Sequence, residues 1–428
     1  MRSKLAYSIA LLLIIFFEDA FGQFQLDTYA IHNVNIIDVE NKGIIKDQTI
    51  VVENELIKSI YSADMHNESD TIYTLDFRGH YIVPGLIDAH VHLGTDPTGN
   101  DNYEKTKERL VHLLQNGVTA VRDMAGDARY LNFISRQALL DEINAPDIYF
   151  SALVAGETFF KDPRTQLAAR GIESGKAPWM RGINAFSDFN KIIAEAKGTG
   201  AIGIKIYADL DRNLIQKVVD AAHSQDLKVW AHSTVFPAKP FEVSEAGVNV
   251  MSHATYMAWE EQDDIPSDAS FRHNKHEKFN INDPVYSSLM KMMNTKNTIL
   301  DATISVYQKR FPDSTLYNYG VDITKLAYQN QVKIGVGSDV TTKTSEENIP
   351  LHKEMEALQN DVGMSPMDII QSATLINAEI LGKESEIGSI VPNKKANMII
   401  LKNNPVIDIR NLESIIAVIK NGKFFNPN

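Results

Sequence analysis

Short apolar segments alternate with helical stretches through the middle of this chain, and this alternation constrains the fold more than any other feature of the sequence. The apolar segments, in order, are YIVPGLIDAHVHL, GVTAVRDM, DIYFSALV, AIGIKIYA, LKVWAHS, VNVMSHA, TILDATI and VKIGVGSD. Helical stretches such as EKTKERLVHLLQN and RNLIQKVVDAAHSQ lie between them. Eight strands over about 300 residues predict an α/β fold, a (β/α)8 or TIM barrel.

The two ends of the chain have a different sequence pattern from the middle. Runs such as AIHNVNIIDV and TIVVENELIKSIYS precede the barrel, NMIILKN and IIAVIKNGKFF follow it, and turn residues separate them. This pattern is typical of β-hairpins. We expect both ends to pair into one small β-sandwich domain, built from residues 23–78 and 385–428, beside a barrel of residues 79–384.

Residues 1–22 have the pattern of a signal peptide. Arg2 and a nearby lysine precede an apolar run, and small residues at Ala20 and Gly22 supply a cleavage site. The apolar run is shorter than the roughly 20 residues that span a bilayer, so a retained membrane anchor is the less favoured alternative. We expect a secreted or periplasmic protein with no membrane attachment after cleavage.

Composition removes several classes of function. The chain has no cysteine, which excludes disulfides, thiolate metal sites and cysteine nucleophiles. An exported chain without disulfides suits a bacterial periplasm. The net charge is −13 and no basic run is dense, so a nucleic acid is not an expected partner. The oligomeric state stays open, a homo-oligomer included.

Polar side chains that bind metals end several of the predicted strands. His90 and His92 end the first strand, and because residues two apart point to the same face, both imidazoles can reach one metal ion. In AIGIKIY the isoleucines occupy one face, so Lys205 and Tyr207 point into the barrel. A lysine there is costly to bury without a partner.

Three later strands end in the same way. His232 ends LKVWAHS, His253 ends VNVMSHA, and Asp339 ends VKIGVGSD behind two glycines that leave room around it. Each residue alone has an ordinary explanation: a core histidine, an ion-paired lysine or a helix cap. Together they lie at the C-terminal ends of strands 1, 4, 5, 6 and 8, the face where barrel active sites lie.

Two stretches between strands are unusually long. Residues 157–185 contain several basic side chains, Lys161 and Arg164 among them, and residues 258–285 are polar. Long loops at this face of a barrel act as lids in many enzymes. A surface insertion without function is the alternative.

The motifs extend over nearly the whole mature chain. They are PGLIDAHVHLG, NGVTAVRDMAG, IKIY, GSD, LHKEMEAL, SPMDIIQSATLINAEILGKESEIGSIVP and VIKNGK. With the two later histidine strands, they resemble the metal-dependent amidohydrolase superfamily, in the branch of imidazolonepropionase and the prolidase-like (Xaa-Pro dipeptidase-like) exported dipeptidases. The segment GETFFKDPR lacks the glycine-rich pattern of many of these dipeptidases, which leaves the substrate pocket less well defined than the metal centre.

The resemblance implies a metal centre with two zinc ions per chain. One ion would be bound by His90, His92 and Asp339. The second would be bound by His232 and His253. Lys205, carboxylated by carbon dioxide, would bridge the two, and its carbamate is an anion that two cations stabilise.

The resemblance also implies an activity, hydrolysis of a C–N amide bond in a dipeptide or N-acyl amino acid. Metal ions make hydroxide available near neutral pH, and Asp339 would act as general base and then as general acid toward the leaving amine. Tyr207, Arg122 and Tyr256 are candidates for binding substrate. A structural role explains Tyr207 equally well, as an aromatic side chain that packs inside the barrel.

Three other functions remain to be weighed. A mononuclear enzyme could open a cyclic amide with Lys205 unmodified, as in imidazolonepropionase. Deamination is disfavoured because no glutamate closely follows His232 or His253. A non-catalytic binding protein would be expected to have lost a ligand, whereas all six positions are filled.

Overall fold

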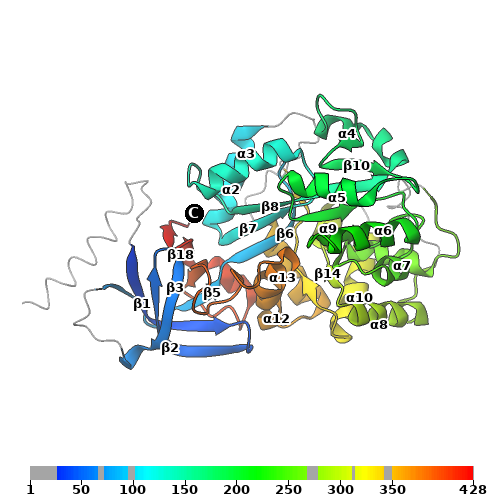
Figure 1. The fold of residues 1–428 in the computed structure, drawn as a ribbon. Coiled ribbons are helices and arrows are strands. Elements are labelled where there is room, and N and C mark those ends of the chain that lie inside the picture. The colour runs from blue at the N-terminus through cyan, green and yellow to red at the C-terminus, as the bar shows by residue number, and fades with distance from the viewer. Residues whose placement is uncertain are drawn as a thin grey trace, which may run out of the picture.

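A computed structural model describes residues 27–65, 72–94, 102–267, 278–310, 314–341 and 349–427. The predicted signal peptide, residues 1–22, lies outside the described residues. Two sheets organise the chain: an 11-stranded sheet in the middle of the sequence and an eight-stranded sheet from its two ends. Figure 1 shows the second sheet, in blue and red, at one end of the molecule beside the first.

The 11-stranded sheet is the predicted barrel. Its parallel strands follow the chain in the order β6, β7, β8, β11, β12, β13, β14 and β15, with the small strands β9 (Lys176–Ala177) and β10 (Met180–Ile183) added at β8. The bounds of the eight are Leu86–His92, Val118–Asp123, Asp147–Gly156, Gly203–Ile206, Lys228–His232, Val250–Ser252, Ile299–Asp301 and Ile334–Gly335. The prediction of a (β/α)8 barrel is confirmed.

The barrel closes through its last strand, which is divided. β15 pairs with β14, whereas β16 (Val340–Thr341) pairs with the first barrel strand, β6. Between them, the Asp339 amide donates to the His90 carbonyl at 2.8 Å. The segment that carries Asp339 is therefore hydrogen-bonded directly to the segment that carries the first histidines.

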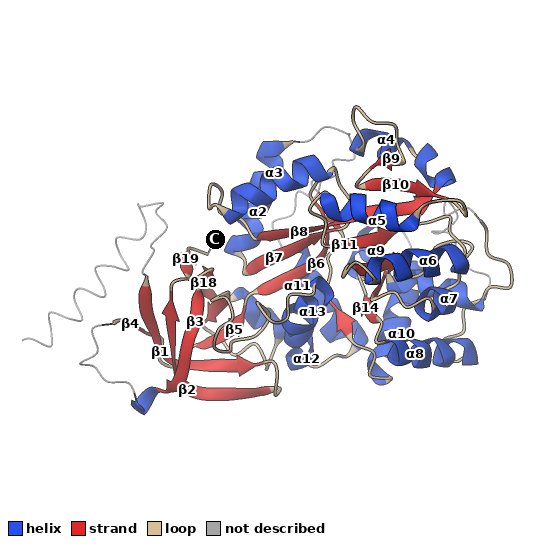
Figure 2. Ribbon diagram, in the orientation of Figure 1, coloured by secondary structure: helices blue, strands red, loops and turns tan. Residues whose placement is uncertain are grey.

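Helices cover the strands on the outside (Figure 2). α6 (Arg212–His223) shows why such segments are helical: Asp211 accepts from the Leu214 amide as an N-cap, and Ile215, Val218 and Val219 form a buried face. The other α-helices are α2 (Tyr103–Gln115), α3 (Ala128–Leu139), α4 (Pro163–Ala168), α5 (Phe189–Gly198), α7 (Pro240–Glu245), α8 (Pro284–Lys296), α9 (Ser305–Arg310), α10 (Thr315–Gln329), α11 (Pro350–Ala357), α12 (Pro366–Gln371) and α13 (Asn377–Leu381). Short 3-10 or π-helical turns are η2 (Ala63–Met65), η3 (Glu157–Lys161), η4 (Ala254–Glu261), η6 (Leu358–Val362), η7 (Ser372–Ile376) and η8 (Ile409–Glu413).

The terminal sheet joins both ends of the chain, as predicted. Its order is β19-β18-β17-β5-β1-β2-β3, with β4 on β1. The bounds are β1 (Thr28–Asp38), β2 (Gly43–Glu53), β3 (Leu56–Ser62), β4 (Tyr73–Asp76), β5 (Tyr81–Pro84), β17 (Met398–Leu401), β18 (Ile415–Lys420) and β19 (Lys423–Phe425). Hydrogen bonds link these strands into one sheet that encloses an apolar cluster of its own.

The first expected strand, YIVPGLIDAHVHL, is in fact two strands. β5 belongs to the terminal sheet, pairing with β1 and β17, and β6 begins the barrel after Gly85. A Cβ at Gly85 would lie 2.3 Å from the Thr119 hydroxyl oxygen, so the chain crosses between the sheets where only glycine fits. The crossing therefore lies slightly later than the expected start of the barrel at residue 79.

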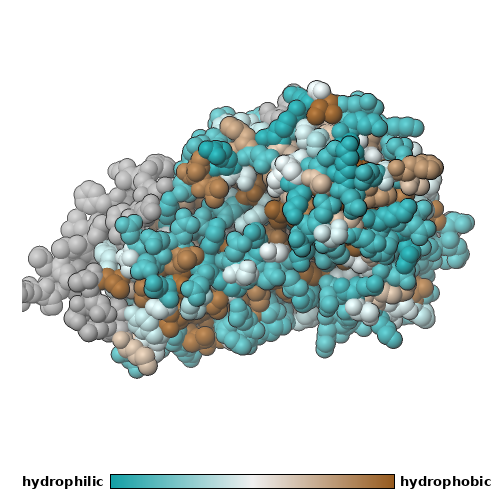
Figure 3. Space-filling model, in the orientation of Figure 1, coloured by the Kyte–Doolittle hydropathy of each residue, from teal (hydrophilic) through white to brown (hydrophobic). Residues whose placement is uncertain are grey.

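The surface is largely polar. Figure 3 shows hydrophilic residues over most of the visible face, with apolar residues in small scattered groups. Within the described residues, no helix combines the length and apolar character that crossing a bilayer requires.

Candidate metal centre

Three side chains from the two ends of the barrel sheet form the core of the site. Nitrogen atoms of His90 and His92 and a carboxylate oxygen of Asp339 all lie within 4.8 Å of one another. Asp339 Oδ1 is 3.1 Å from His92 Nε2 and 3.7 Å from His90 Nε2. The barrel closure described above brings together residues that are far apart in the sequence.

The turn that carries Asp339 is fixed by the first strand. The Asp88 carboxylate accepts from the Ser338 amide at 3.0 Å and from the Ser338 hydroxyl at 2.6 Å. A Cβ at Gly337 would lie 2.5 Å from His90 Cβ and from Asp301 Oδ1, so a side chain there would occupy the site. Asp339 itself has a left-handed backbone, with φ of 51°. This turn is built to hold one carboxylate against the histidines.

His232 and His253 extend the cluster from the neighbouring strands. The ring centroids of His90 and His253 are 4.9 Å apart, and those of His232 and His253 are 4.7 Å apart. His253 follows β13 with φ of 71°, and its Nδ1 lies 2.8 Å from the Thr303 hydroxyl. The four imidazoles therefore form a continuous row across the mouth of the barrel.

Lys205, from β11, lies close enough to His90 and His253 to affect their pKa values. Its side chain is fully buried, and its Nζ has no hydrogen-bond partner among the described residues. Burial, together with the nearby Arg122 charge, lowers the pKa of Lys205 to about 7. Burying the ammonium group of an unmodified lysine here therefore costs free energy, whereas an anionic derivative facing cations would be stabilised.

The protonation states fit a divalent cation. Burial lowers the pKa of His90 and lowers that of His253 further, so both imidazoles are neutral and offer a lone pair. Burial alone would raise the pKa of Asp339, but the hydrogen bond from His92 brings it below its usual range. Neutral imidazoles and an ionised carboxylate are the states in which these groups bind metals.

The three candidates for substrate binding lie in different surroundings. Tyr207 and Tyr256 both flank His232, with ring centroids 4.1 and 5.7 Å from it, and thus border the cluster. Arg122 is fully buried, and its guanidinium donates to Asp301 at 3.0 Å and stacks 4.6 Å from the centre of the Trp230 ring. Because these internal partners hold Arg122, we assign it no contact with substrate.

Sequence reasoning missed two residues beside the site. Asp301, at the end of β14, bonds His90 Nδ1 at 2.7 Å, and the strand-end rule that selected the histidines would also have selected it. Arg164 of α4 lies near Tyr207, and this proximity of two distant segments has no signal in the sequence.

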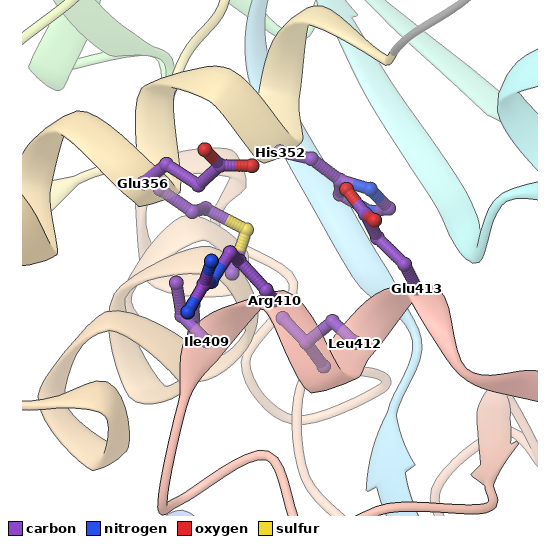
Figure 4. Close-up of a pocket in the computed structure, with 7 residues that line it drawn as sticks. His352, Glu356, Ile409, Arg410, Leu412 and Glu413 are labelled. Carbon is purple, nitrogen blue, oxygen red and sulfur yellow. The ribbon is translucent and has the colours of Figure 1, made fainter.

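A separate surface pocket lies between α11 and η8. It is lined by His352, Met355, Glu356, Ile409, Arg410, Leu412 and Glu413. Figure 4 shows the labelled side chains on these two facing segments. None of the strand-end residues lines this pocket, so it is not part of the candidate metal centre.

Comparison with known proteins gives one family. The sequence pattern of the amidohydrolase family matches residues 81–425. A dihydroorotase of Staphylococcus epidermidis is 34% identical over 82 residues, which are 19% of this chain and 19% of that protein. The chain thus aligns with about a fifth of the length of this relative.

Solved structures show the same fold over nearly the whole chain. A Xaa-Pro dipeptidase with bound methionine superposes with a TM-score of 0.71 and 22% identity, covering 93% of this chain and 100% of the other. Ochratoxinase of A. niger superposes with a TM-score of 0.72 and 19% identity, covering 95% and 97%. At these identities the likeness shows the fold alone.

Proposed function

The chain belongs to the amidohydrolase family, hydrolases that act on C–N bonds, and from that premise we propose that it cleaves a dipeptide or N-acyl amino acid at a metal centre. One observation carries the proposal: His90, His92 and Asp339 converge within 4.8 Å at the mouth of the barrel. His232 and His253 extend the same cluster, and near them lies Lys205, whose Nζ has no hydrogen-bond partner in the described part of the chain.

Five side chains would hold two metal ions, and Lys205 would bridge the ions. His90, His92 and Asp339 would hold one zinc ion, and His232 and His253 a second. When bound, these ions supply Lewis acidity toward a water molecule and toward the carbonyl oxygen of the substrate.

Lys205 would be carboxylated. Its neutral amine attacks the carbon of CO2, a C–N bond forms, and one proton leaves to solvent, which gives a carbamate anion. The buried amine, without a hydrogen-bond partner among the residues that the structure describes, and its pKa of about 7 support this step, because a neutral amine is the nucleophile. Carboxylation also removes the cost of burying an isolated ammonium.

Asp339 would move the proton. Its carboxylate is ionised and adjoins both histidines of the first strand, so it can accept a proton from the attacking water. It would then donate that proton to the departing nitrogen, which leaves as an amine. The side chain thus changes role between the two halves of the reaction.

We further propose that Arg164 binds a carboxylate of the substrate. Its guanidinium pairs with Asp162 at 2.6 Å, lies near Tyr207 and is 47% exposed. Tyr207 packs against His232, so Tyr207 lies between Arg164 and the metal cluster, and a substrate carboxylate would have to compete with Asp162 for the Arg164 guanidinium. Dipeptides and N-acyl amino acids both carry the carboxylate that this charge would recognise.

Replacement of Arg164 tests this role. We expect Arg164→Gln to raise KM for an N-acyl amino acid about 10- to 100-fold, the value of a charged hydrogen bond. KM for the corresponding amide, which lacks the carboxylate, should stay unchanged. Lys161→Gln, on the same segment, is the matched control. An equal loss for both substrates would exclude carboxylate recognition by Arg164.

Metal removal tests the function itself. Dialysis against a chelator should abolish hydrolysis of a panel of dipeptides, N-acyl amino acids and cyclic amides, and zinc should restore it. Two zinc ions per chain would support the binuclear centre. One zinc ion with cleavage of cyclic amides alone would favour the mononuclear alternative. A zinc-, cobalt- or manganese-loaded protein that cleaves no amide in the panel would contradict the proposal.

We also propose that the protein is exported, as residues 1–22 indicate. The enzyme used for these assays can be purified from the periplasm of a bacterial host. A mature chain that begins at Gln23 would support cleavage of the signal.

A further inference from the structure

Asp301 lies beside the metal cluster without joining it. Its Oδ2 accepts from His90 Nδ1 at 2.7 Å, from Arg122 at 3.0 Å and from the Ser252 hydroxyl at 3.0 Å. His90, Arg122, Ser252 and Asp301 are all buried. One carboxylate oxygen thus collects three donors from three other barrel strands.

Arg122 anchors this carboxylate to the strand that carries His90. Its Nε donates to the carbonyl of Ala89, the residue before His90, and its guanidinium stacks on the Trp230 ring. Trp230 is in turn fixed by a 3.2 Å hydrogen bond from its Nε1 to the Ile380 carbonyl. The position of Asp301 relative to the His90 backbone is therefore determined by rigid, buried partners.

The arrangement decides which nitrogen of His90 carries the proton. An ionised carboxylate only accepts hydrogen bonds, so His90 Nδ1 must be the donor. The lone pair of the neutral ring is then on Nε2, the atom 3.7 Å from Asp339 Oδ1. Asp301 thus leaves a lone pair on the side of His90 that faces the cluster.

The residues after Asp301 act on a second histidine. Thr303 Oγ1 lies 2.8 Å from His253 Nδ1, which leaves His253 Nε2 for the cluster. The segment is held from outside, because the buried Glu354 carboxylate accepts from the Ile304 amide at 2.9 Å and the Ser305 amide at 2.7 Å. The end of β14 and the loop after it therefore contact histidines from the first and the sixth barrel strand.

We propose that Asp301, held by Arg122, is the positioning residue that sets the tautomer and orientation of His90 for metal binding. Thr303 contacts the Nδ1 atom of His253 in the same way that Asp301 contacts the Nδ1 atom of His90. The strand that ends in Asp301 supplies no ligand itself. This inference rests on the metal centre of the proposed function.

The test compares the affinity for zinc, measured by competition with a chromophoric chelator. Asp301→Asn should weaken zinc binding about 10- to 100-fold, as loss of an outer hydrogen-bond partner of a histidine ligand does. The cobalt(II) form should show a changed visible absorption spectrum. Ser252→Ala, which removes one donor from the same oxygen but keeps the carboxylate, is the matched control and should retain wild-type affinity.

A second variant guards against a folding defect. Asp301→Asn leaves the buried Arg122 charge without its partner, and an unpaired buried charge destabilises the folded protein. The double variant Asp301→Asn with Arg122→Met removes that charge, and it should fold as wild type does by circular dichroism while still binding zinc weakly. A folded double variant with wild-type zinc affinity and cobalt spectrum would overturn the inference.

The tautomer can be read without metal. In the nitrogen-15 NMR spectrum of metal-free wild type, His90 should carry its proton on Nδ1. A proton on Nε2 would overturn the inference even if the metal centre is correct. Failure of the wild type to bind any divalent metal would instead contradict the proposed function.

Discussion

Asp339→Asn is expected to lower kcat by about 10²- to 10⁴-fold, the range for loss of a general acid–base group. The carboxylate is ionised and adjoins His90 and His92, whereas an amide can neither accept the proton of the attacking water nor carry it to the leaving nitrogen. The overall fold should persist, because the Asp339 backbone amide keeps its hydrogen bond to the His90 carbonyl. Steady-state kinetics of zinc-loaded protein measures the effect.

The control for this variant lies one residue earlier. Ser338→Ala removes the hydroxyl contact to Asp88 and perturbs the same turn without touching the carboxylate, so it should lower kcat by less than about tenfold. Zinc content must be measured for both proteins, because Asp339 is also a proposed ligand. An Asp339→Asn enzyme with full zinc content and more than about a tenth of wild-type kcat would remove Asp339 from the proton-transfer role.

The sequence predicted which side chains on a strand point into the barrel, toward the cluster. His90 and His92 are two apart on one strand, and Lys205 alternates with isoleucines, so their inward direction follows from strand geometry alone. The C-terminal ends of parallel strands meet at one edge, which places His232, His253 and Asp339 in the same region. Local periodicity together with the topology of parallel strands therefore predicted which side chains lie at this end of the barrel.

Pairings between distant side chains could not be predicted in the same way. The contact of Arg122 with Asp301 depends on how strands 2 and 7 face each other across the barrel interior. From the sequence alone, Arg122 on strand 2 is a candidate for pairing with a substrate carboxylate. Likewise, the proximity of Arg164 to Tyr207 depends on the path of a long loop, which no period in the sequence encodes.

The boundaries of several strands depend on which strands they pair with rather than on their composition. YIVPGLIDAHVHL is apolar throughout, yet β5 pairs with β1 and β17 while β6 pairs with β7 and β16. The last barrel strand is divided for a related reason, since β15 and β16 have partners on opposite sides of the closure. Such partners become known only when the whole sheet is assembled.

Replacing Lys205 should have opposite effects on activity and on stability. Lys205→Met removes the bridging group of the proposed centre, and a loss of several kcal/mol of metal assistance corresponds to a decrease in kcat of roughly 10³-fold. In metal-free protein, the same change removes a buried polar atom that has no partner among the described residues. The free energy of unfolding at pH 7 should rise by about 1–3 kcal/mol.

The pH dependence of unfolding separates these effects from a general repacking. The pKa of Lys205 is about 7 in the folded protein and near 10.5 in the unfolded chain, so between these values only the unfolded chain holds the proton. The metal-free, CO2-depleted wild type should therefore gain stability from this group as the pH rises from 7 to 10, and Lys205→Met should lack that gain. Urea titrations at several pH values measure the difference.

A reconstitution with bicarbonate and a control variant at an exposed lysine complete the test of the role of Lys205. Reconstituting the wild type with zinc in the presence of bicarbonate should raise both its zinc content and its activity, because CO2 is the source of the carbamate, whereas Lys205→Met should respond to neither. Lys191→Met, at a side chain that is 71% exposed, should match the wild type throughout. A Lys205→Met protein that keeps its activity would contradict the bridging role, and one that is less stable than metal-free wild type at pH 7 would contradict the cost assigned to the buried amine.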